Sequence, residues 1–73
     1  MIRDINIATT VSKLMLDVSD RLEESVVMIK KSSAPDEFTN YRGAVAGILG
    51  EILINVLNPI YSEHPSLKPP GFE

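Results

Sequence analysis

Five carboxylates are the side chains best suited to joint chemistry, because acids on neighbouring helices can hold Mg²⁺ or a di-iron centre. Four of them fall in one stretch and the fifth lies farther along the chain: Asp17, Asp20, Glu23, Glu24 and Glu51. A di-iron bundle also needs a Glu-x-x-His motif, and the sequence contains none. We therefore interpret the acids as a solvated charged face. A Mg²⁺ site formed between subunits by Asp17, Asp20, Glu24 or Glu51 is the alternative.

The other reactive residues do not form a catalytic pattern. His64 is the single histidine and there is no cysteine, so a His/Cys metal site and a disulfide are both excluded. No Gly-x-Ser-x-Gly elbow surrounds a serine, and no phosphate-binding loop joins a strand to a helix. Residues 58–61 match the Asn-Pro-x-Tyr motif that some adaptor domains bind. The same four residues are equally explained by a helix that ends at a proline and is followed by a tyrosine that anchors the chain. We expect neither enzyme activity nor a cofactor.

Size and charge narrow the class of protein further. A chain of 73 residues forms at most one domain, and such a small core usually needs a disulfide, a metal or a partner chain to support it. Self-association is the remaining support, and 44% apolar residues can supply an interface. The net charge of −3 argues against nucleic-acid binding. The start of the chain does not resemble a secretory signal, which together with the missing cysteines favours the cytoplasm.

The first predicted helix spans residues 5–31. Its apolar residues recur at steps of three and four, which places them on one helical stripe: Ile7, Val11, Leu14, Val18, Leu22, Val26 and Ile29. Asp4 is the expected N-cap, and lysines 30 and 31 suit the negative end of the helix dipole. On the opposite side lie Ile5, Leu16 and Val27, which we expect either to be exposed or to contact a further subunit.

A second helix is predicted over residues 35–58, after a break that contains proline. Ser33 and Asp36 resemble a capping box. The link between the helices is only a few residues long, so the two helices should form an antiparallel hairpin. Pairing around Ser33 would place Arg42 near glutamates 23 and 24, and Glu51 near Lys13.

The end of the second helix is expected at Asn58, because Pro59 has no N–H and clashes with the preceding turn. The most apolar stretch, residues 44–57, is shorter than the roughly 20 residues of a membrane span, so we predict a buried core helix and no membrane contact. Residues 62–73 are predicted to be an extended, proline-rich tail. We expect it to wrap the protein through Leu67 and Phe72; the alternative is that it binds an aromatic groove of a partner as a polyproline II helix.

The second helix has a wider apolar arc than one neighbouring helix can cover. This arc and the three glycines opposite it make up the predicted interface: Phe38, Tyr41, Val45, Ile48, Leu49, Ile52, Leu53, Val56, Gly43, Gly47 and Gly50. A glycine costs about 1 kcal/mol relative to alanine inside a helix. We interpret the glycines as a face of close backbone packing; the alternative is an exposed surface that tolerates weak helix formers.

Together these patterns predict an all-α protein in which residues 1–61 form the hairpin. Two copies should associate as a homodimeric four-helix bundle, or more copies as a higher oligomer. The predicted function is a non-enzymatic, self-associating protein–protein interaction or regulatory module, whose partner is a second copy or another protein. Two alternatives stay open: a Mg²⁺-dependent enzyme with an acidic site between subunits, and a small membrane-active protein.

Overall fold

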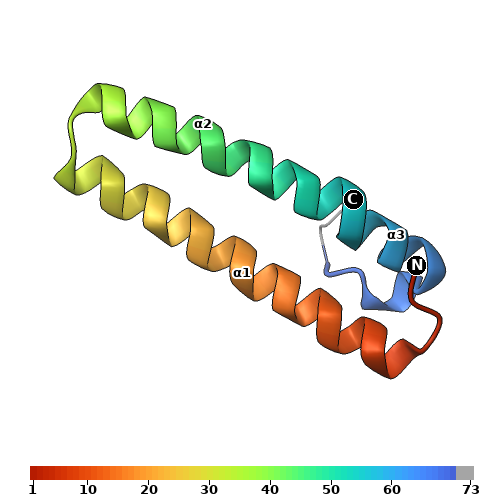
Figure 1. Ribbon diagram of the computed structural model, residues 1–73. Coiled ribbons are helices and arrows are strands. Elements are labelled where there is room, and N and C mark those ends of the chain that lie inside the picture. The colour runs from red at the N-terminus through yellow and green to blue at the C-terminus, as the bar shows by residue number, and fades with distance from the viewer. Residues whose placement is uncertain (71–73) are drawn as a thin grey trace.

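Two long helices dominate the computed structural model, which describes residues 1–70 and contains no strand among them. Helix α1 spans Ile5–Ser32 and helix α2 spans Pro35–Ile52. They lie side by side and run in opposite directions, with a two-residue link at one end (Figure 1). The result is an elongated layer with principal dimensions of 45 × 20 × 16 Å.

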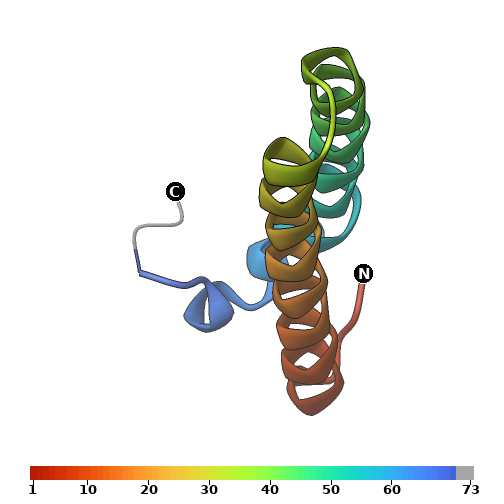
Figure 2. The same cartoon turned by 90° about the vertical axis from the view of Figure 1, so that its left-hand side faces the viewer.

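Three short elements follow α2. A π-helical turn spans Leu53–Leu57, helix α3 spans Asn58–Glu63, and a 3₁₀ turn spans Pro65–Leu67. The segment after α3 leaves the layer on one side (Figure 2). Residues 65–67 are therefore a helical turn where an extended tail was expected, and Leu67 packs against the core. Phe72, the other expected anchor of the tail, lies outside the described residues.

Helix α1 begins at the cap that the sequence indicates. Asp4 is extended, and its Oδ1 accepts hydrogen bonds from the backbone N–H groups of Asn6 at 2.8 Å and Ile7 at 3.2 Å. These bonds satisfy donors that have no partner within the helix. At the other end two lysines occupy the last turn, and the backbone N–H of Ser33 closes the helix on the Ile29 carbonyl at 3.0 Å.

The start of α2 differs from the expected capping box. Its N-cap is Ala34 and not Ser33, and the Oε1 of Glu37 accepts a hydrogen bond from the Ala34 backbone N–H at 3.2 Å. Pro35 explains the shift, because the residue before a proline prefers an extended backbone and proline itself suits the first helical position. Ala34 has φ −65° and ψ 152°, as this reason requires.

The helical run does not end at Asn58. It passes through the π-helical turn and Pro59 and continues to Glu63, which corrects the predicted end. In the π turn the backbone N–H of Asn58 donates to the carbonyl of Leu53, five residues back. Pro59 has no N–H and cannot donate a backbone hydrogen bond within the helix. The π turn lies immediately before this position, where the regular series of helical hydrogen bonds is interrupted.

The π turn brings the end of the helical run back onto α1. Regular helix faces are separated by steps of three or four residues, but five residues separate Ile52 from Leu57. A π turn inserts one extra residue, which corrects the phase by about 100°. Consequently Leu57, Ile60 and Tyr61 are 3%, 0% and 5% exposed.

The core lies at the end of the layer that holds the N-terminus and α3. Its buried cluster consists of Ala8, Leu57, Ile60 and Tyr61. Between this cluster and the link, Val45 is the single buried apolar side chain among the described residues. The half of the layer near the link therefore has very little core of its own.

A hydrogen bond between side chains fixes the alignment of the two helices. The hydroxyl oxygens of Ser25 and Tyr41 lie 2.7 Å apart. Ser25 Oγ also lies 2.6 Å from the carbonyl of Leu22, which can only accept, so Tyr41 donates to Ser25 and Ser25 donates to Leu22. Residues 25 and 41 are equally distant in sequence from Ser33, around which the helices pair.

Candidate interaction surface

The structure does not gather the carboxylates into a site. Asp17, Asp20, Glu24 and Glu51 are all exposed, as is Glu23. No group of three or more acidic, histidine or cysteine side chains among residues 1–70 has the geometry of a metal site. Asp17 forms an ion pair with Arg21 one helical turn away, at 3.3 Å, and such an exposed pair contributes little to stability.

Ion pairs between α1 and α2 are absent from the described residues. Arg42 and Glu23 do line one hollow between the helices, as the alignment predicts. However, the Arg42 guanidinium lies 5.5 Å from the centre of the Phe38 ring, and the Lys30 ammonium lies 5.9 Å from the same centre. Cation–π contacts of this length hold the charged groups over the ring.

The N-terminal segment meets the end of α3. The Met1 ammonium pairs with the Glu63 carboxylate. His64 is partly buried, and its Nε2 lies 2.7 Å from the backbone carbonyl of Ile2. A carbonyl oxygen can only accept, so Nε2 is the donor. These contacts hold the N-terminal segment against the buried cluster, to which Ile2 also contributes.

The Met1–Glu63 pair predicts a specific pH dependence. The hydrogen bond from the Met1 ammonium, helped by its charge, lowers the pKa of the Glu63 carboxyl. A folded-state pKa below the unfolded value gives stabilisation that is present above the unfolded pKa, about 4.3, and is lost as the pH falls through the folded pKa. The melting temperatures of the wild type and Glu63→Gln should therefore differ at neutral pH and converge in acid. Acetylating the N-terminus should remove the same difference, and an unchanged difference at acidic pH would contradict the pairing.

The Asn-Pro-x-Tyr motif at residues 58–61 is not accessible as a docking peptide. They are helical within α3, and Ile60 and Tyr61 belong to the buried cluster. Burial also raises the pKa of the Tyr61 phenol. The structure thus supports an aromatic anchor at Tyr61, although the helix does not stop before it.

The residues predicted as an interface are divided among several environments. Val45 is buried against α1, and Ile48 is 48% exposed. The remaining apolar members are partly buried: Phe38, Tyr41, Leu49, Ile52, Leu53 and Val56. The arc is thus covered along its middle by α1 and left open at its margins.

The glycine face has no neighbour within the chain. A Cβ atom built on Gly43, Gly47 or Gly50 would find no other group within 4 Å. Close backbone packing at these residues is therefore absent among residues 1–70. A close contact on this face would have to come from outside the described part of the chain.

The apolar stripe predicted on α1 divides into two seams. One seam faces α2 and includes Ala8, Ser12, Leu22 and Val26, all buried or partly buried. The other includes Ile7, Leu14 and Met28, which are 56%, 53% and 60% exposed. The predicted stripe is therefore wider than α2 covers in one chain, because α2 lies over only one of two adjacent rows. The seven-residue spacing of the exposed row was the signal in the sequence.

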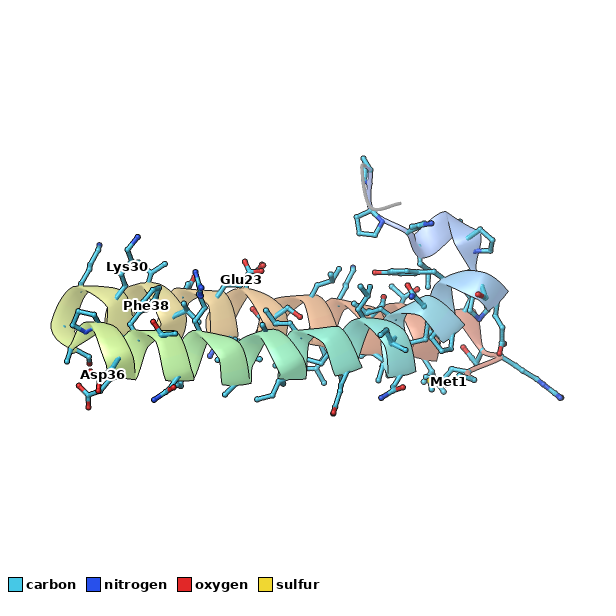
Figure 3. All side chains as sticks on the ribbon, turned by 90° about the horizontal axis from the view of Figure 1, so that it is seen from above. Met1, Glu23, Lys30, Asp36 and Phe38 are labelled. Atoms are coloured by element: carbon cyan, nitrogen blue, oxygen red, sulfur yellow. The ribbon has the colours of Figure 1, made fainter. Side chains whose placement is uncertain are left out.

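The layer consequently has two different sides. We call the first the hollow side, because Leu16, Glu23, Arg42, Leu49 and Leu53 line shallow hollows there. Glu23, Lys30 and the segment after α3 lie on this side (Figure 3). Leu16, expected opposite the core stripe, is partly buried in these hollows, whereas Val27 is 50% exposed.

We call the second the heptad side. It carries two rows with alternating steps of three and four residues, a spacing that lets a further helix pack against each row. The α1 row is Ile7, Val11, Leu14, Val18, Arg21, Ser25 and Met28, and the α2 row is Tyr41, Ala44, Ile48, Glu51 and Asn55. The tail leaves the layer on the other side, so it does not cover these rows.

One continuous helical run in the described chain is long and apolar enough to cross a membrane. It spans Pro35–Glu63, 29 residues. Within its apolar 18-residue stretch only 17% is buried. The expectation that this helix is too short for a membrane therefore does not hold. A core helix of a soluble protein can have the same length and composition, so this observation alone gives weak support to a membrane location.

Comparisons with known proteins yield no relative. No protein-family model matches the chain, nor does any curated protein or solved structure.

Proposed function

We propose that the chain is a non-enzymatic protein that functions by self-association, as a homodimeric four-helix bundle built from two helical hairpins. The observation that carries this proposal is the set of apolar side chains that one chain leaves exposed. Eight large apolar side chains among residues 1–70 are about half exposed or more. Four of them, Ile7, Leu14, Met28 and Ile48, lie together on the heptad side.

The core of one chain also supports the proposal. Five apolar residues are buried among residues 1–70, and four of them sit at one end. A domain of this size buries too little surface to be more than marginally stable. A second copy would cover apolar rows that the first leaves in water, at about 25 cal/mol per Å² of apolar surface buried.

The proposal includes that the protein is soluble in water and lies in the cytoplasm. Burial of the exposed rows in a dimer would remove Ile7, Leu14, Met28 and Ile48 from water, which suits a water-soluble cytoplasmic module. The apolar run Pro35–Glu63 favours one competing function, a membrane-active protein. Glu51, Asn55 and Asn58 within this run would be costly in a bilayer, so we favour association in water.

Light scattering of the purified chain, with and without detergent micelles, tests the proposal. We expect a dimer in water at micromolar concentration, because the exposed rows need a partner. Helical circular dichroism should fall on dilution as the dimer dissociates. A folded monomer over the whole concentration range would contradict self-association. Insolubility in water together with uptake into micelles would instead support the membrane alternative.

A further inference from the structure

The two rows of the heptad side have their midpoints at the same level of the layer. The α1 row runs from residue 7 to 28, with its middle at Val18, and the α2 row runs from residue 41 to 55, with its middle at Ile48. Ser25 lies opposite Tyr41. Seven residues back from Ser25 is Val18, and seven residues forward from Tyr41 is Ile48. Because the helices are antiparallel, Val18 and Ile48 lie side by side.

This coincidence makes the heptad side complementary to itself. We propose that two copies pack through this side, with a twofold axis perpendicular to the helices at the level of Val18 and Ile48. The proposal rests on the self-association proposed above and assigns its surface and orientation. The axis places α1 antiparallel to α1 of the other copy, and α2 antiparallel to α2. Ile7 then packs near Met28 of the other copy, and the two Ile48 side chains meet at the axis.

The charges on the two rows agree with this orientation. Each row has one charged residue, Arg21 on α1 and Glu51 on α2. Arg21 lies three residues from Val18 toward the link, and Glu51 lies three residues from Ile48 toward the chain ends. The twofold axis exchanges these levels, so Arg21 of one copy comes to the level of Glu51 of the other. A twofold axis parallel to the helices would not exchange these levels, so Arg21 of one copy and Glu51 of the other would remain at different heights along the helices.

The dimensions of the layer also suit a dimer. A stable interface takes about 800 Å² of surface from each partner. The described layer is 45 Å long and 20 Å wide, so one whole side provides an area of this order. The hollow side is less suitable, because the segment after α3 projects from it.

Single-cysteine variants test the surface and the axis, since the chain has no cysteine of its own. Ile48→Cys should form a disulfide-linked dimer under mild oxidation. Val27→Cys is the matched control, being 50% exposed against 48% for Ile48 but on the opposite side. We expect Ile48→Cys to cross-link at least about tenfold faster, because a disulfide needs Cβ atoms about 4 Å apart. Equal or slower cross-linking in a protein that light scattering shows to be dimeric would overturn the inference and leave self-association standing.

Two further measurements test the orientation, and the second, the charge exchange, keeps the inference testable if Ile48→Cys folds poorly. Mixing Val18→Cys with Ile48→Cys chains should give little mixed disulfide, whereas an axis parallel to the helices would make that product dominant. Arg21→Glu and Glu51→Arg should each weaken the dimer, and the double variant should restore it. Failure of the double variant to recover would overturn the proposed orientation. A chain that is monomeric in every experiment would contradict both the orientation and the proposed function.

Discussion

Replacing Ile60 with alanine is expected to lower the free energy of unfolding by about 2–5 kcal/mol, the usual cost of truncating a fully buried isoleucine. Ile60 has no exposed surface and lies at the centre of the buried cluster. Small domains have a total stability of about 5–15 kcal/mol, with the smallest at the lower end. The change should therefore remove much of the stability, and a large part of the protein should be unfolded at 37 °C.

Ile54→Ala is the matched control, because it makes the same chemical change six residues earlier in the same helical run. Ile54 is 66% exposed, so its truncation should change the free energy of unfolding by no more than about 0.5 kcal/mol. Urea unfolding followed by circular dichroism compares the two variants, at one protein concentration because association contributes to stability. Similar losses for both variants would mean that the buried cluster is not the main source of stability.

The sequence predicts the two long helices because their signals are local. Asp4 caps the first helix through atoms two and three residues away. Pro35 makes Ala34 the residue that starts the second. Neither feature depends on distant parts of the chain. The alignment of the helices also follows from a local property, because a two-residue link leaves little choice of pairing.

The errors arise where a residue's environment depends on distant contacts. Ile7 and Val26 belong to one stripe by periodicity, but α2 covers only the row that contains Val26, and this depends on its orientation against α1. His64 is partly buried because Ile2 lies beside it, 62 residues away in sequence. The sequence indicated only part of the surface that we propose for self-association: Ile48 was among the predicted interface residues, whereas the exposed row on α1 was predicted as part of a helical stripe and not as interface.

Pro59 shows why a strong local rule can fail. Proline usually ends a helix through a lost N–H and a steric clash. Here the five-residue interval between Ile52 and Leu57 already requires an irregular turn if both are to contact α1. The π turn meets this requirement immediately before the proline. The burial of Ile60 and Tyr61 stabilises the continued helix, and this gain is absent from any rule on the local sequence.

This explanation predicts opposite results for a deletion and an insertion at the π turn, both made with Pro59→Ala so that a regular helix is possible. Deleting Ile54 removes the extra residue, and a continuous α-helix then keeps Leu57, Ile60 and Tyr61 against α1. Inserting an alanine after Ile54 turns these residues by a further 100° or so and exposes the cluster. We expect the deletion variant to melt within about 5 °C of the Pro59→Ala parent, and the insertion variant to lose cooperative melting.

Circular dichroism during heating distinguishes these outcomes, with the Pro59→Ala protein as the reference for both. Either variant changes the chain length by one residue at the same site, so differences in length or position cannot explain opposite effects. The two variants differ only in the rotation that they impose on the helix after the turn, which is in opposite directions. If the deletion unfolds the protein as thoroughly as the insertion, the π turn does not set the phase, and the contact of α3 with α1 must depend on the N-terminal segment that contacts Glu63 and His64.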